Sequence, residues 1–94
     1  MKSVTKRALL TSKEIQEICV SNGAQVLSVC VQHECIWVFI EENVNAYNEF
    51  DTSQKIEFAV FKADRQFYTD AFQFLGTVVI NFGNDIYHVF YRFV

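Results

Sequence analysis

Two alternating apolar segments, residues 26–31 and 35–40, are separated only by the polar tripeptide Gln32-His33-Glu34. Alternating positions project to opposite faces of a β-strand, and two such segments joined by a short polar turn predict a β-hairpin. Neither face of this hairpin is polar. Leu27, Val29 and Val31 share one face of the first strand and Val26, Ser28 and Cys30 the other, while Ile36, Val38 and Ile40 alternate with Cys35, Trp37 and Phe39. We therefore expect both faces to be covered, by other elements or by a second subunit.

Three further segments carry strand patterns. Residues 55–61 alternate, residues 72–82 are apolar and contain Gly76 as an expected bulge, and residues 86–93 alternate again after the Gly83-Asn84-Asp85 turn. In the last segment Ile86, His88 and Phe90 should face away from Tyr87, Val89, Tyr91 and Phe93.

Residues 10–23 admit two interpretations. Thr11 followed by Glu14 forms a helix capping pattern, with Gly23 beyond the end, whereas residues 14–20 alone also fit a strand that turns at Ser21-Asn22-Gly23. Residues 1–10 are predicted to be a flexible basic N-terminus, and residues 41–54 an acidic and polar loop.

Composition narrows the class of protein. The chain has 94 residues, enough for one domain with a single modest core, and ten Phe, four Tyr and one Trp predict an aromatic, sheet-like core. A net charge of −3 argues against binding to nucleic acid, whose phosphates are also negative. Three cysteines and no long apolar run predict a reduced, cytoplasmic protein without a membrane span.

Three blocks of sequence carry a family resemblance. They are Gly23-Ala24-Gln25-Val26-Leu27-Ser28-Val29 followed by Cys35-Ile36-Trp37, then Leu75-Gly76-Thr77, and finally Ile86-Tyr87-His88-Val89-Phe90. In order and spacing they resemble a family of short, functionally uncharacterised proteins carried by bacteriophages and prophages. The family's proline before Gly-Ala is replaced here by Ser21-Asn22, and its Gly-Thr-Gly loop by Lys62-Ala63-Asp64. The resemblance favours the strand interpretation of residues 14–20.

Together these patterns predict a single, mainly β domain over residues 1–94. We expect about six strands in a mostly antiparallel sheet or a small open barrel, with a short N-terminal helix (an α+β protein) as the alternative. Such a sheet has too few elements to cover both its faces and its edges, which predicts a homo-oligomer, a dimer in the first instance.

Candidate chemistry is sparse. Cys30, His33 and Cys35 are potential zinc ligands, but their spacing fits no common finger, so we expect no metal and no cofactor. No phosphate loop, nucleophile elbow or metalloprotease helix is present in the sequence, which predicts a protein that is not an enzyme. The candidate binding residues are aromatic residues that could stack on a planar base and cations that could hold phosphate: Trp37, Lys62, Arg65, Tyr87, His88 and Tyr91.

The phage resemblance and the lack of catalytic motifs imply an accessory binding protein. We expect a stoichiometric inhibitor of a bacterial anti-phage defence in the host cytoplasm, which binds either a defence protein or a small nucleotide signal. The alternative is a structural or assembly component of the phage particle, in which two apolar faces serve self-association.

Overall fold

The computed structural model describes residues 1–43 and 54–94, and in these ranges the chain forms only strands, turns and bends. The strands, in chain order, are β1 (Lys2–Leu9), β2 (Ile15–Val20), β3 (Gln25–Gln32), β4 (Cys35–Asn43), β5 (Gln54–Lys62), β6 (Gln73–Ile80) and β7 (Asp85–Phe93). Seven strands in the described ranges confirm the mainly β class and add one strand to the number expected.

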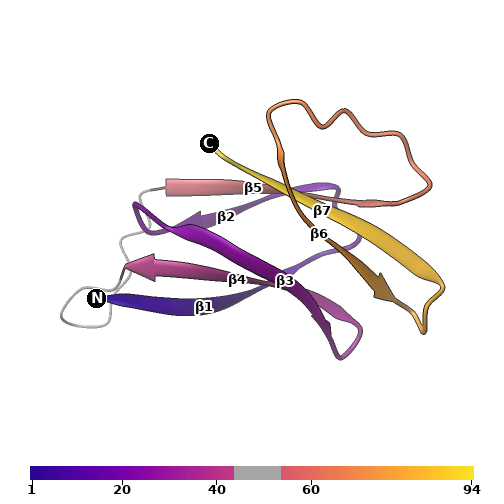
Figure 1. The fold of residues 1–94 in the computed structure, drawn as a ribbon, viewed down its shortest axis with the longest axis horizontal. Coiled ribbons are helices and arrows are strands. Elements are labelled where there is room, and N and C mark those ends of the chain that lie inside the picture. The colour runs from indigo at the N-terminus through magenta and orange to yellow at the C-terminus, as the bar shows by residue number, and fades with distance from the viewer. Residues whose placement is uncertain (44–53) are drawn as a thin grey trace.

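The strands form two antiparallel sheets (Figure 1). Sheet A has the order β1-β4-β3, and sheet B has the order β2-β5-β7-β6. The two sheets pack face to face as a sandwich and do not close into a barrel. The chain changes sheets between β1 and β2, between β2 and β3, and between β4 and β5, whereas the β3–β4 and β6–β7 hairpins each stay within one sheet.

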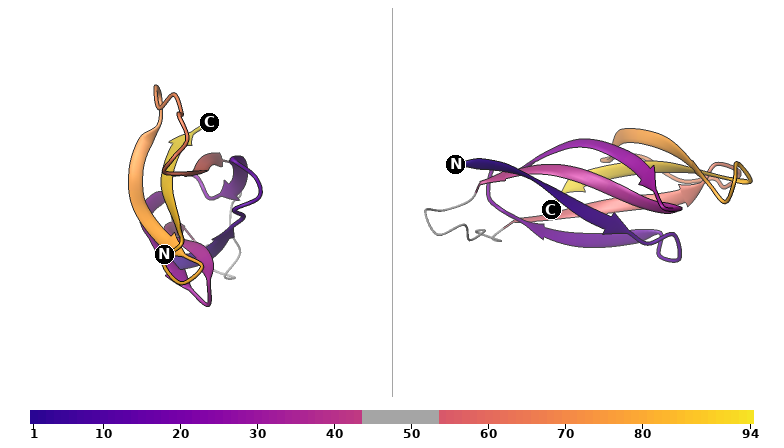
Figure 2. Two further views of the ribbon diagram at one scale, coloured as in Figure 1. Left: turned by 90° about the vertical axis from the view of Figure 1, so that its right-hand side faces the viewer. Right: turned by 90° about the horizontal axis from the view of Figure 1, so that it is seen from below.

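Both hairpin tips lie at one end of the molecule, opposite the N-terminus (Figure 2). The molecule is elongated, with principal extents of 44 × 30 × 18 Å. The β3–β4 turn has only two residues, His33 and Glu34, with φ of 54° and 60°, because Gln32 already pairs with Cys35. Positive φ at both central positions is the geometry of tight hairpin turns that match the twist of the strands.

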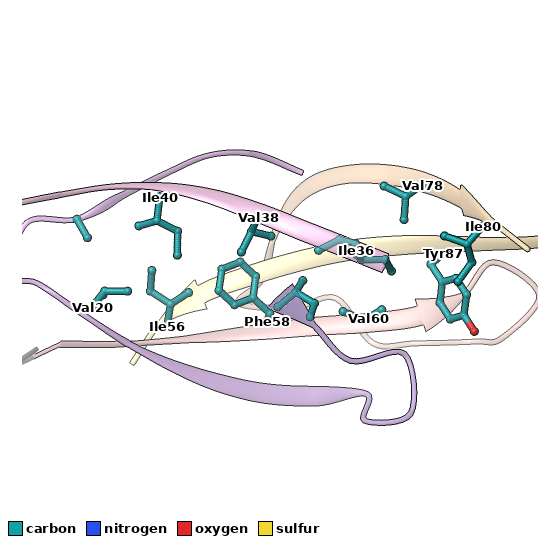
Figure 3. Close-up of a cluster of buried hydrophobic side chains, with 13 residues drawn as sticks. Val20, Ile36, Val38, Ile40, Ile56, Phe58, Val60, Val78, Ile80 and Tyr87 are labelled. Carbon is teal, nitrogen blue, oxygen red and sulfur yellow. The ribbon is translucent and has the colours of Figure 1, made fainter. Parts of the chain in front are cut away.

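The core lies between the sheets (Figure 3). Ile36, Val38 and Ile40 project from β4 toward Ile56, Phe58 and Val60 on β5, so the alternation in each segment reappears as one buried layer. Val78, Ile80, Tyr87 and Val89 of the β6–β7 hairpin complete this core, with Leu9, Val20 and Ala24 at its margins. Every one of these side chains is buried, which is the main source of stability for the sandwich.

A bulge in β3 changes the predicted faces of that strand. The pairing to β4 shifts between Val26 and Ser28, so Val26, Val29 and Val31 all pack against the core, while Leu27 is exposed. The extra residue reverses the alternation. The sequence placed Leu27 on the face of Val29 and Val31 and Val26 on the opposite face, and both placements were wrong.

The predicted bulge at Gly76 is confirmed, since the pairing of β6 to β7 shifts between Phe74 and Gly76. A Cβ atom at Gly76 would lie 2.7 Å from Cγ1 of Val29, where β6 and β3 approach each other. Glycine therefore permits the close contact between the edges of the two sheets.

The N-terminal helix alternative was wrong, because Ile15–Val20 pairs along its whole length with β5. The buried Gln16 side chain accepts from the Leu10 N–H and donates to the carbonyl oxygens of Leu10 and Lys13, fixing a turn where the helix was to begin. Long-range pairing and a satisfied buried amide override a local capping signal.

The predicted flexible N-terminus was also wrong, because residues 2–9 form β1 against β4. The predicted loop at residues 41–54 begins too early, since residues 41–43 belong to β4 and Gln54 to β5. The remaining ten positions of that prediction, 44–53, lie outside the described residues.

Candidate functional site

Three predicted site residues meet at one hollow. Lys62 ends β5, Arg65 follows in a turn whose N–H donates to the Lys62 carbonyl at 3.1 Å, and Tyr87 is the partner of Lys62 on β7. With Thr11, Ser12 and Glu14 they line a hollow of about 230 Å³. Hydroxyl groups and cations are therefore gathered at the end of β5, as phosphate binding would require.

Carboxylates already engage both cations. Arg65 forms an ion pair with Glu14, and the Lys62 ammonium lies 3.5 Å from a carboxylate oxygen of Asp85. All four side chains are at least partly exposed, so each pair contributes little to stability. The charge of the hollow is nevertheless balanced, and a phosphate would have to displace Glu14 or Asp85.

His88 lies on the outer face of sheet B and not in this hollow. Its Nδ1 is 2.8 Å from the Thr77 hydroxyl, and its ring packs edge-on against Phe61 and Phe74 at centroid distances of 6.1 and 6.3 Å. The imidazole is half-buried and hydrogen-bonded. This is the environment of a packed structural histidine.

The surroundings of His88 form a second hydrophobic layer that sequence reasoning missed. Residues 63–72 connect β5 to β6, which run parallel on either side of β7, and they cross the outer face of sheet B. Phe67 stacks on Phe61 with the ring centroids 4.3 Å apart, and Phe90 also stacks on Phe61, at 5.7 Å. Phe67 and Phe72, between two predicted strands, were the available signal, because a crossover between parallel strands must cover a sheet face.

Trp37 lies on the outer face of sheet A, far from these groups in the fold. Its indole N–H donates to the Gln32 carbonyl at 3.2 Å, and the Lys6 ammonium lies 4.2 Å from the ring centroid. Lys6 is also the cross-strand partner of Phe39. The lysine side chain therefore covers Trp37 within the chain itself.

Tyr91 projects inward from β7 and packs against Phe58 at 6.3 Å. It lines a separate hollow of about 530 Å³ together with Asn22, Gly23, Ala24, Gln25, Val26, Gln54 and Phe93. The six predicted residues therefore fall into four environments, and the aromatic residues among them do not line one cavity.

A buried polar network joins residues of the predicted flexible N-terminus (1–10) to residues of the predicted loop (41–54). The Glu42 carboxylate is fully buried and accepts from the Thr5 hydroxyl, from Arg7 at 3.0 Å and from the Ser21 N–H at 3.1 Å. The Ser21 hydroxyl in turn accepts from the Asn43 N–H at 2.8 Å. These bonds tie β1, β4 and the β2–β3 turn together.

The tip of the β6–β7 hairpin presents one aromatic side chain to solvent. Asn81, Phe82 and Gly83 have consecutive positive φ values of 53°, 54° and 89°, and Phe82 is 91% exposed. The Asn81 N–H donates to the Glu34 carboxylate of the other hairpin, and the Asn84 N–H donates to the Asn81 carbonyl at 3.0 Å. These bonds hold the tip in a conformation that a bulky residue rarely adopts.

The described ranges meet neither the requirements of a metal site nor those of a membrane-spanning helix. Residues 1–43 and 54–94 contain no group of three potential metal ligands, and Cys19, Cys30 and Cys35 are free thiols. No helix of sufficient length and hydropathy to span a membrane occurs in the same ranges.

Comparison with known proteins gives one match. A family model described as Domain of unknown function (DUF7352) matches residues 1–93. No curated protein and no solved structure matches the chain.

Proposed function

We propose that this chain, which belongs to the DUF7352 family, is an accessory binding protein that associates stoichiometrically with a bacterial defence protein during phage infection. The resemblance of its three sequence blocks to short phage and prophage proteins supports the setting. The lack of a recognisable catalytic motif supports binding as the mode of action. The contact is made by the β6–β7 tip.

Phe82 is the observation that carries this proposal. A non-glycine residue in the left-handed region costs on the order of 1–3 kcal/mol, and an exposed ring gains nothing from burial in the core. Both properties oppose the stability of the isolated fold. Strained backbone that is held by surrounding bonds is concentrated at functional sites, and exposed aromatic residues are frequent anchors of protein interfaces.

A protein partner fits the geometry better than a nucleotide does. The hollow beside Lys62 and Arg65 has about 230 Å³, whereas small-molecule sites usually have roughly 300–1,000 Å³. Its cations are already paired with carboxylates. The larger hollow beside Tyr91 has no cation among its lining residues in the described part of the chain to meet a phosphate.

The alternative function is a structural component of a phage particle. An exposed aromatic tip would serve a lattice contact as well as it would serve an inhibitor. Mass spectrometry of purified particles discriminates the two, because a structural protein is present in many copies and an early inhibitor is absent.

The test begins with bacteria that each carry one defined defence system and express this chain. We expect plaque formation to be restored against one of them, and the purified chain to bind the corresponding defence protein in isothermal titration. Phe82→Asn should abolish both effects, because it removes the anchor while keeping a residue that tolerates positive φ. The matched control is Tyr68→Asn, which removes an aromatic side chain 80% exposed in another loop and should keep full binding.

Stability separates an anchor from a structural residue. Phe82→Asn should raise the free energy of unfolding by about 1 kcal/mol in urea titrations, since it relieves the strain at φ 54°. A variant that loses stability, or one that keeps full binding, would contradict the assigned role of Phe82.

A further inference from the structure

We propose that the outer face of the β6–β7 hairpin is the contact surface of a homodimer. This hairpin face consists of three cross-strand pairs that project outward: Phe74 with Phe90, Thr77 with His88, and Val79 with Ile86. It is separate from the tip at Phe82, so the inference stands independently of the proposed function.

The hairpin face carries three large apolar side chains that the described part of the chain leaves exposed on two neighbouring strands. Phe74, Val79 and Ile86 are 59%, 49% and 44% exposed. On sheet A, by contrast, Lys6 covers Trp37, and on the neighbouring strand of sheet B, Phe67 covers Phe61. Apolar side chains that a chain does not cover itself indicate a surface for association.

The distribution of charge favours a second copy of this chain as the partner that binds the hairpin face. The six residues of the hairpin face carry no formal charge, whereas the ion pair Lys55–Glu17 at 3.9 Å joins β5 to β2 and the ion pair Arg92–Glu57 at 2.6 Å joins the end of β7 to β5. In a two-fold dimer, a charge near the axis meets the same charge of the other copy. A chain of net charge −3 therefore pairs best through a face without charges.

The order of the three pairs also suits two-fold symmetry. A two-fold axis through the central pair, Thr77 and His88, places the aliphatic pair Val79–Ile86 of one copy on the aromatic pair Phe74–Phe90 of the other. The hairpin face is thus self-complementary, because aliphatic side chains meet aromatic rings on both sides of a central polar pair.

The available area fits a weak dimer. The exposed side chains of the hairpin face present on the order of 500 Å² per copy. Two copies would bury about 1,000 Å², the lower limit for a specific interface. We therefore expect a dissociation constant on the order of tens of micromolar.

Sedimentation equilibrium of the full chain, from about 10 µM to about 300 µM, tests the proposal. Wild type should pass from monomer to dimer across this range. Val79→Lys should weaken the dimer at least about tenfold, because two lysines would be buried against aromatic rings. The matched control is Val4→Lys, a valine 55% exposed on the outer face of β1 in sheet A, which should leave the dimer unchanged.

A cross-linking variant keeps the test decisive if Val79→Lys fails to fold. In a chain with Cys19, Cys30 and Cys35 replaced by serine, Thr77→Cys places a thiol beside the two-fold axis and should give a disulfide-linked dimer on oxidation, while Val4→Cys should not. A wild-type chain that is monomeric at the highest concentration overturns the proposal, whether the face then serves another protein or none. A dimer that responds to Val4→Lys and not to Val79→Lys overturns it as well.

Discussion

Adjacent glutamates at the end of β4 have opposite environments. Glu42 points inward, is fully buried and accepts bonds from Thr5, Arg7 and Ser21, whereas Glu41 points outward and lies 3.5 Å from the exposed Lys2 ammonium. A buried carboxylate that loses its charge leaves its donors unsatisfied, while a surface ion pair is replaced by water.

We therefore expect Glu42→Gln to lower the free energy of unfolding by about 2 kcal/mol, because the Arg7 guanidinium loses its charged partner in a buried site. Glu41→Gln is the matched control and should cost less than about 0.5 kcal/mol. Urea denaturation measures both variants. Equal losses for the two would show that the Glu42 network does not bind β1 to the rest of the fold.

At the scale of elements, the contact between the edges of β3 and β6 depends on one missing side chain. Gly76 leaves the space that Cγ1 of Val29 occupies, and the χ1 angle of a β-branched valine is restricted, so the side chain moves away only at a cost. Both strands carry a bulge close to this contact, between Val26 and Ser28 in β3 and between Phe74 and Gly76 in β6.

Gly76→Ala should destabilise the protein by about 1–3 kcal/mol through overpacking. Val29→Ala removes the clashing methyl groups, so the double variant Gly76→Ala with Val29→Ala should lose less stability than the sum of the two single variants. A double-mutant cycle in urea measures this coupling. Strict additivity would mean that the two strand edges do not touch as the structure shows.

At the scale of the whole molecule, stability is unevenly distributed over the strands. β5 lies at the centre of sheet B and buries Ile56, Phe58, Ala59, Val60 and Phe61, because it faces the core on one side and the aromatic crossover layer on the other. β1 lies at an edge and buries only Leu9. Opening of β1 therefore exposes little apolar surface.

Native-state hydrogen exchange should reveal this difference. We expect the amides paired between β5 and β7 to exchange only by global unfolding, and those of β1 to exchange at least about tenfold faster through local opening. Two-dimensional NMR after transfer to deuterated solvent measures both sets. Equal protection of β1 and β5 would indicate that the Glu42 network makes β1 part of the central cooperative unit.

Local patterns in the sequence predicted the strands of the two hairpins and of β5. The β3–β4 and β6–β7 hairpins, a strand at residues 55–61 and the bulge at Gly76 followed from alternation and turn residues, because these signals depend on neighbours in the chain. The separate residues Lys62, Arg65 and Tyr87 were also identified as candidates, although nothing local indicated that Glu14 and Asp85 would neutralise the cations.

The tertiary structure alone decided the features that depend on distant partners. β1 and β2 are strands because β4 and β5 supply their hydrogen bonds, which overrode a basic composition at one and a helix cap at the other. The Leu27 bulge, the aromatic crossover and the burial of Glu42 likewise require contacts between residues far apart in sequence. Pairing energy between distant strands exceeds local propensity, so a single sequence encodes these features without displaying them.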